Sequence, residues 1–143
     1  MMIFEISGAP SPQKQTQWTR TGIAYDPSKK SKEFIQWQIR PHAPEKPLEC
    51  PIEMHLTFYL PIPKSTSGVR RRQMVNGVIL PKGRPDVDNL AYLVTNALKK
   101  IIYHDDSLIT DLHIHKRYGE TPKTVIKIIP IEELSPLGGT KCA

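Results

Sequence analysis

The chain has 143 residues, which is enough for one domain with a modest hydrophobic core. It carries 20 Lys and Arg against 14 Asp and Glu, a formal net charge of +6, and its 38% hydrophobic content indicates a globular protein and not a chain that is disordered throughout. No uncharged apolar stretch is long enough to cross a bilayer, and the N-terminus has no signal-peptide pattern. We therefore expect neither a membrane protein nor a secreted one, and we expect a cytoplasmic location.

Hydrophobic periodicity and the positions of the prolines predict elements in the order strand, helix, strand, helix, strand, strand. The expected strands are 3–7, 52–60, 109–118 and 123–131, and the expected helices are 31–40 and 88–102. The second helix is the clearest, because its apolar residues form one continuous stripe from Leu90 to Ile101. These elements predict an α+β fold with a small mixed sheet and two main helices, in one domain over 1–134 with a flexible tail over 135–143.

Basic residues gather in two segments without useful periodicity. The connection between 61 and 85 has no acidic residue, and the loop after the first strand is also basic. A connection of this length in a small domain is usually functional or disordered. We expect these segments to hold nucleic-acid phosphates, with a solvated basic loop as the alternative. Trp18 is a candidate for stacking on a base, whereas Trp37 is expected in the core. The expected phosphate contacts are Lys14, Arg20, Lys64, Arg70, Arg71, Arg72, Lys82 and Arg84.

Aspartates lie at both ends of the second predicted helix. Because the apolar stripe begins only at Leu90, we expect Asp86 to be extended and Asp88 to lie at or near the N-cap, so that both carboxylates converge beside the helix N-terminus. Asp105 and Asp106 follow the other end, about 21 Å away at 1.5 Å per residue. They reach the first pair only if another element or a partner chain carries them there.

Converging carboxylates bind a hard cation, and all-oxygen ligation selects Mg²⁺ or Mn²⁺ over zinc. Beside an acid-free basic loop, such a cation suits the metal-assisted hydrolysis of a phosphodiester. The alternative is that these aspartates only cap the helix and occupy turns. The spacing by itself leaves both interpretations open.

The stretch Pro85-Asp86-Val87-Asp88-Asn89-Leu90, followed by Asp105-Asp106-Ser107-Leu108-Ile109, resembles the RusA family of Holliday-junction resolvases. The opening Ile6-Ser7-Gly8-Ala9-Pro10 with Lys14, and the late Lys116-Arg117-Tyr118, are also similar to that family, so the resemblance covers most of 3–131. It implies a homodimer that uses Mg²⁺, with Mn²⁺ as a substitute, to cut four-way DNA junctions by paired symmetric nicks in recombination and repair. It also implies a bacterial or phage-infected host cell. By motif position, the metal-binding and catalytic aspartates are Asp86, Asp88 and Asp106.

One position departs from the family pattern. RusA-like proteins typically have a catalytic lysine four residues after the second motif aspartate, where this chain has Tyr92. Residues 88 and 92 share a helix face, so the departure lies at the site and predicts slow cleavage. Two alternatives therefore stay open: a junction-binding protein with weak or lost catalysis, and a Mg²⁺ nuclease that acts on another branched nucleic acid.

Three other residues are candidates beside this site or apart from it. Asp105 is the alternative to Asp106 as the third metal-binding aspartate. His104 adjoins Asp105 in the sequence and is a candidate to orient the two aspartates or to contact phosphate. His113 and His115 alternate with apolar residues on a predicted strand, so both face one side. Paired histidines can bind a transition metal, but no third ligand is evident, and a solvated strand face is the default interpretation. No P-loop, nucleophile-elbow or dinucleotide motif supports another enzyme class.

Overall fold

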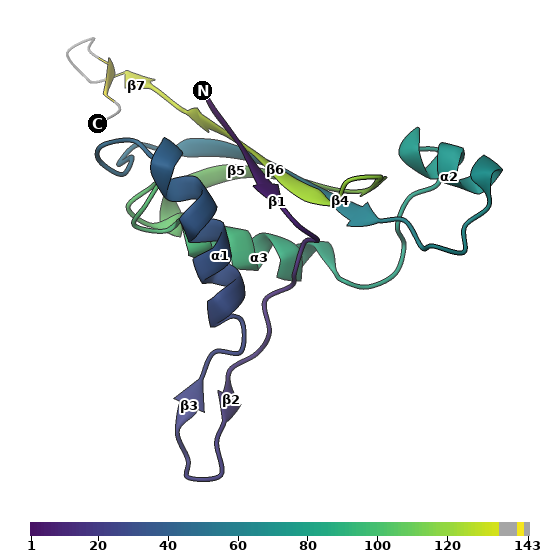
Figure 1. The fold of residues 1–143 in the computed structure, drawn as a ribbon. Coiled ribbons are helices and arrows are strands. Elements are labelled where there is room, and N and C mark those ends of the chain that lie inside the picture. The colour runs from purple at the N-terminus through teal and green to yellow at the C-terminus, as the bar shows by residue number, and fades with distance from the viewer. Residues whose placement is uncertain (135–139, 142–143) are drawn as a thin grey trace.

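The structure is a computed structural model that describes residues 1–134 and 140–141. Its centre is a four-stranded sheet in the order β1-β6-β4-β5, built from β1 (Met2–Ser7), β4 (Ile52–Pro61), β5 (Ile109–Gly119) and β6 (Lys123–Pro130). β6 pairs antiparallel with both β1 and β4, whereas β4 and β5 run parallel. The predicted mixed sheet is therefore confirmed, and β5 forms one of its edges (Figure 1).

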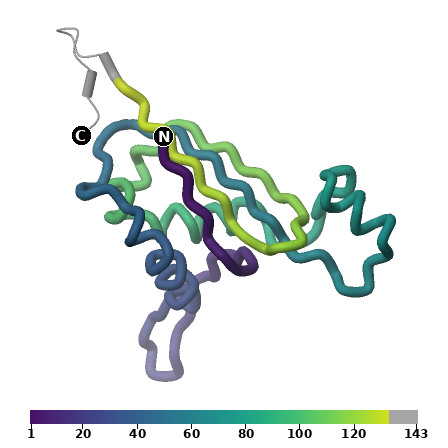
Figure 2. Tube along the Cα trace, turned by 45° about the horizontal axis from the view of Figure 1, so that its top comes forward, coloured from purple at the N-terminus to yellow at the C-terminus, as the bar shows by residue number. Residues whose placement is uncertain are grey.

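One face of this sheet carries the hydrophobic core. Residues of β4 alternate between buried and half-buried positions, because successive side chains point to opposite faces. α1 (Lys29–Ile39) and α3 (Val87–Leu98) pack against each other on the buried side of the sheet (Figure 1). The apolar stripe of α3 is buried there, with Leu90, Leu93 and Leu98 in the core. These two helices leave the opposite face of the sheet uncovered (Figure 2).

α3 is shorter than its apolar stripe predicted, because it ends at Leu98 instead of continuing to 102. Lys99 is extended, with ψ of 135°, and Lys100 has a φ of 70°, in the left-handed region that few side chains adopt. The turn allows Tyr103 to be buried in the core, and the backbone of Tyr103 forms a β-bridge with Leu48. This tertiary pairing outweighs the local helical pattern.

The connection between 61 and 85 contains a third helix, α2 (Gly68–Val75), which the sequence analysis did not predict. It begins after Ser67, whose hydroxyl accepts a hydrogen bond from the backbone N–H of Arg70 at 3.4 Å. Only Met74 is buried in this helix, so the apolar pattern of the segment is too weak to predict a helix. The basic loop after β1 likewise contains a short hairpin of β2 (Gln17–Trp18) and β3 (Ala24–Tyr25).

The other predicted elements agree with the structure to within two residues. One expectation about them is wrong, since Trp37 is 74% exposed on α1, where Ile35 and Ile39 take the core-facing positions. The structure also has two 3₁₀ turns. One, η1 (Arg40–His42), follows α1, and the other, η2 (Asp106–Leu108), precedes β5.

Most of the tail expected over 135–143 lies outside the described residues. The described part, Thr140–Lys141, forms β8 and pairs with β7 (Glu133–Leu134). No helix in the described part of the chain is long and apolar enough to cross a membrane.

Candidate active site and nucleic-acid interface

The first two aspartates of the expected site lie at the N-terminus of α3. Asp86 is the N-cap residue, with extended backbone (φ −74°, ψ 145°), but its side chain makes no capping hydrogen bond. Asp88 lies in the first turn, two positions after the N-cap near which the sequence predicted it. Both are exposed, and neither carboxylate has an ion-pair or side-chain hydrogen-bond partner among the residues that the structure describes. Two uncommitted carboxylates therefore stand where the partial positive charge of the helix favours them.

The segment that leads to Asp86 is held by the sheet. The ammonium of Lys116, on β5, donates hydrogen bonds to the carbonyl oxygens of Gly83 and Pro85 at 2.5 and 3.0 Å. On the other side, the backbone N–H of Gln13 donates to the carbonyl of Asn89 at 2.9 Å. The sequence named Lys116 only within the family resemblance and gave it no role, because the contact joins a strand to a loop about thirty positions earlier in the sequence. These contacts hold the backbone on both sides of Asp86.

Asp105 and Asp106 lie at the opposite end of α3, against Lys99. The Asp105 carboxylate accepts the backbone N–H of Ser107 at 3.2 Å and pairs with the Lys99 ammonium at 3.1 Å. These contacts hold the pKa of Asp105 well below its ordinary value, and the contact with Ser107 contributes more than the one with Lys99. In return, the two aspartates raise the pKa of Lys99. Asp106 lies 3.5 Å from the same ammonium. Asp106 is thus the less engaged carboxylate of the pair, because its ion pair with Lys99 is the longer of the two.

The two groups of aspartates do not meet within one chain. α3 has 12 residues, which at 1.5 Å per residue separates its ends by about 18 Å. No cluster that would hold a metal joins Asp86 or Asp88 to Asp106 among the described residues. His104 is exposed beside Asp105, and its backbone N–H donates to the carbonyl of Leu48 at 2.9 Å. The separation expected from the helix length is therefore present in the structure.

Tyr92 lines a surface hollow close to the N-terminal end of α3. The hollow also contains Lys14 and Lys32, together with Asn89 and Asn96. The Lys32 ammonium is engaged by Asp26 at 2.6 Å, and this contact is the main reason why the pKa of Asp26 is lowered. The Lys14 ammonium has no ion-pair partner in the part of the chain that the structure describes. Lys14 is thus the available cation next to Tyr92.

The expected phosphate contacts lie on two projections and on the segments beside them. Arg20 lies at the tip of the β2–β3 hairpin, close to Trp18, which is 70% exposed. Lys64 precedes α2, Arg70, Arg71 and Arg72 lie on it, and Lys82 and Arg84 follow it on the way to α3. The hairpin and the α2 segment extend from the body of the molecule in different directions (Figures 1 and 2). Basic charge spread over two separate projections suits an extended polyanion better than a small ligand.

The protein is a basic α+β domain with exposed aspartates at a helix N-terminus and two basic projections, features that are typical of proteins that bind nucleic acid. The chain belongs to the RusA endodeoxyribonuclease family, whose family model matches residues 7–129. It is also similar to a protein of Bacillus subtilis (strain 168) described as "Uncharacterized protein YqaN", with 33% identity over 132 residues that cover 87% of this chain and 93% of the relative. Membership of this family makes the chain an endodeoxyribonuclease of the class that resolves Holliday junctions.

Proposed function

We propose that this protein is a Mg²⁺-dependent, structure-specific endonuclease that resolves four-way DNA junctions by paired symmetric nicks, in recombination and repair. The observation that carries the proposal is the pair of uncommitted carboxylates, Asp86 and Asp88, at the N-terminus of α3 in a RusA-family chain. Asp106 is the third acid of the site. The phosphate contacts are the basic residues of the β2–β3 hairpin, of α2 and of the segments that flank them.

The residues fit a hard divalent cation. The donors are carboxylate oxygens, and neither Asp86 nor Asp88 is engaged by a described neighbour, so both can turn toward an ion. When bound, the ion supplies an activated water and neutralises charge on the scissile phosphate. Mn²⁺, which accepts the same oxygen donors, is expected to substitute.

The chain's own residues position the acids and the DNA. Lys116 holds the carbonyls on either side of Arg84 and so sets the direction in which Asp86 leaves the loop. Lys14, in the hollow beside Tyr92, is placed to contact a backbone phosphate close to the acids. The arginines of α2 then hold an arm of the junction at a distance from the cut.

We further propose that the working unit is a homodimer whose sites are shared between the two chains. Asp86 and Asp88 lie about one helix length from Asp106 in a single chain, so a partner copy must supply Asp106 if all three are to bind one ion. A two-fold arrangement then creates two identical sites, which matches the two symmetric nicks that a four-way junction requires.

The test of the activity uses a synthetic four-way junction with labelled strands. Wild-type protein in Mg²⁺ is expected to produce nicks at symmetric positions in two opposing strands, and no nicks in EDTA. Linear duplex of the same sequence serves as the substrate control, and Asp88→Asn serves as the protein control. Equal cleavage of the duplex would contradict structure specificity.

The shared site is tested by mixing inactive variants. When Asp88→Asn and Asp106→Asn chains are combined, a mixed dimer with shared sites contains one site with all its aspartates, so single nicks should reappear. If each site were built from one chain, both sites of the mixed dimer would lack an aspartate. An absence of nicking after subunit exchange would therefore contradict the shared site while leaving the activity itself untouched.

A second candidate function is favoured by Tyr92. A neutral phenol stands where RusA-like proteins typically carry a lysine, so the chain could bind junctions and cleave them weakly or not at all. Tight junction binding without cleavage in Mg²⁺ or Mn²⁺ would support this alternative. Cleavage of a flap or an RNA in preference to the junction would instead identify another branched substrate.

A further inference from the structure

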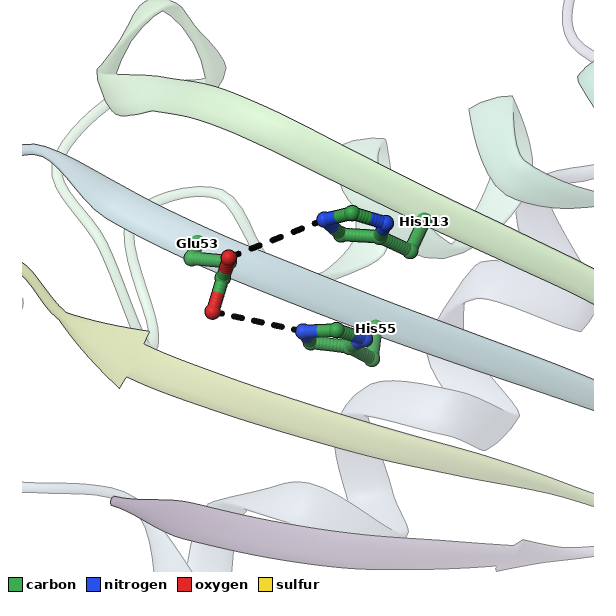
Figure 3. Close-up of side chains that lie close together, drawn as sticks. All are labelled: Glu53, His55 and His113. Atoms are coloured by element: carbon green, nitrogen blue, oxygen red, sulfur yellow. Dashed lines mark ion pairs between the residues drawn. The ribbon is translucent and has the colours of Figure 1, made fainter.

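Three side chains converge on the uncovered face of the sheet, apart from the aspartates. Glu53 and His55 lie on β4, and His113 lies on β5 directly opposite His55 in the strand register. Glu53 Oε2 is 3.3 Å from Nε2 of His55, and Glu53 Oε1 is 3.6 Å from Nε2 of His113 (Figure 3). The two imidazole rings are stacked, with centroids 4.3 Å apart and planes 7° from parallel. Two ring nitrogens are thus directed at one carboxylate.

These donor atoms lie close enough together to bind one metal ion after small adjustments. One ligand atom from each residue lies within 4.8 Å of the other two. Two ligands on a tetrahedral ion, at bond lengths of about 2.1 Å, are about 3.4 Å apart. The nitrogen-to-oxygen distances of 3.3 and 3.6 Å are close to this value, although each nitrogen faces a different oxygen of the Glu53 carboxylate. An ion would therefore require small movements of the side chains, chiefly a tilt of the two rings so that both lone pairs meet it.

The donor types select the metal. Two imidazoles and one carboxylate form a ligand set used by zinc and related divalent transition metals, whereas Mg²⁺ prefers oxygen alone. Asp111 is in register with Glu53 on β5 and lies two residues before His113, so it adds a second negative charge on this face. Lys127, on β6, is in register with His55 and contributes the opposing positive charge.

We propose that Glu53, His55 and His113 bind a divalent transition metal of the zinc class, with the remaining coordination positions open to water. The site is distinct from the magnesium site proposed above, because it lies on the face of the sheet away from α3. The ion joins the central strand β4 to the edge strand β5, and β5 also carries Lys116. A ligand that binds the folded state and not the unfolded state stabilises the folded state. The ion should therefore raise the unfolding temperature of the protein.

The experiment is a calorimetric titration of the full chain with ZnCl₂ in excess Mg²⁺, which occupies sites made of oxygen alone. Wild-type protein is expected to bind one zinc ion. His113→Ala should lower the zinc affinity by about tenfold or more, because losing a residue that only supports a metal ligand already costs about that much affinity and His113 is a ligand itself. Glu53→Gln, which keeps both rings, should also weaken it. The matched control is His115→Ala, because His115 lies on the same face of β5 but is in register with Thr57.

A second readout reports the ligand atoms and the stability of the folded protein instead of the heat of binding. Co²⁺ bound by wild-type protein should give the visible absorption of a nitrogen- and oxygen-ligated ion, and zinc added in excess Mg²⁺ should raise the melting temperature above its value in Mg²⁺ alone. At a metal concentration that just saturates the wild type, both effects should persist in His115→Ala and be strongly reduced in His113→Ala. No zinc binding by the wild type, or equal losses in the two histidine variants, would overturn the proposal and leave a hydrogen-bonded Glu53–histidine group. Circular dichroism of each variant confirms that it is folded before the titration is interpreted.

Discussion

The ammonium of Lys116 lies 3.0 Å from the carbonyl oxygen of Pro85, and it thereby ties the edge strand β5 to the residue before Asp86. The same ammonium donates a second hydrogen bond, to the carbonyl oxygen of Gly83. A loop that carries a metal ligand is useful only if its position is defined to a fraction of an ångström. Lys116 therefore acts as a positioning residue.

Removing this contact is expected to slow cleavage without preventing DNA binding. We predict that Lys116→Met lowers the single-turnover rate about tenfold, which corresponds to about 1.4 kcal/mol, and that Mg²⁺ titration shows a higher half-saturating concentration. The control is Lys46→Met, which removes the same charge from an exposed turn. Equal rates for the two variants would show that the loop holds Asp86 without Lys116.

The two adjacent aspartates should behave differently. We predict that Asp106→Asn abolishes cleavage while junction binding persists, as do Asp86→Asn and Asp88→Asn, because each removes an anionic ligand of similar size. Asp105→Asn should retain activity, since Asp105 is occupied by Ser107 and Lys99. Cleavage assays on the same junction decide this, and the reverse pattern would identify Asp105 as the ligand.

Asp105 should instead contribute to stability, with a defined pH dependence. Its pKa is lowered in the folded protein from an ordinary value of 3.8, so folding is favoured when this group is ionised. The contribution is present above that value and is lost as pH falls below it. We predict that Asp105→Asn melts at a lower temperature than wild type at pH 7, and that the difference shrinks below about pH 4. A difference independent of pH would mean that charge is not its cause.

The arginines of α2 are expected to contact phosphates. Replacing Arg70, Arg71 and Arg72 together by Ala should weaken junction binding and reduce the slope of log affinity against log salt by roughly 0.9 per lost contact. Alanine maintains the helix, and Ser67 still caps it. Arg40→Ala with Lys46→Ala, at exposed positions away from α2, provides the comparison per charge. An unchanged slope would show that the α2 cluster is only solvated.

Tyr92 should limit the rate of the chemical step. A lysine at this position is one helical turn beyond Asp88 and would place an ammonium where charge develops on the phosphate. We predict that Tyr92→Lys raises the single-turnover rate about tenfold, or about 1.4 kcal/mol, with nearly unchanged affinity.

Lys14 provides the check on that interpretation, because it shares the hollow with Tyr92. If Lys14 already supplies the cation, Lys14→Met should slow the wild type strongly and Tyr92→Lys should restore the loss. If Tyr92→Lys is no faster than wild type and Lys14→Met is harmless, neither residue lies at the chemistry.

Local patterns in the sequence were sufficient for the main elements. The alternation along 52–60 and the stripe from Leu90 predicted β4 and the start of α3, because the periods of strand and helix are properties of the backbone itself. The motif around Asp86 and Asp88 predicted the family, which the family model confirms. Helix α2 escaped prediction because a single buried residue leaves almost no periodic signal.

Contacts between distant segments were decided only by the tertiary structure. α3 ends at Leu98 because Tyr103 pairs with Leu48, and Lys116 reaches Pro85 because β5 passes beside the loop. The sequence pairs His113 with His115 as two possible metal ligands on one strand. The parallel pairing of β4 and β5 instead places His113 opposite His55 and beside Glu53. Strand register depends on the packing of the whole sheet, so a sequence read along one strand shows which face a side chain occupies and not which neighbour it meets.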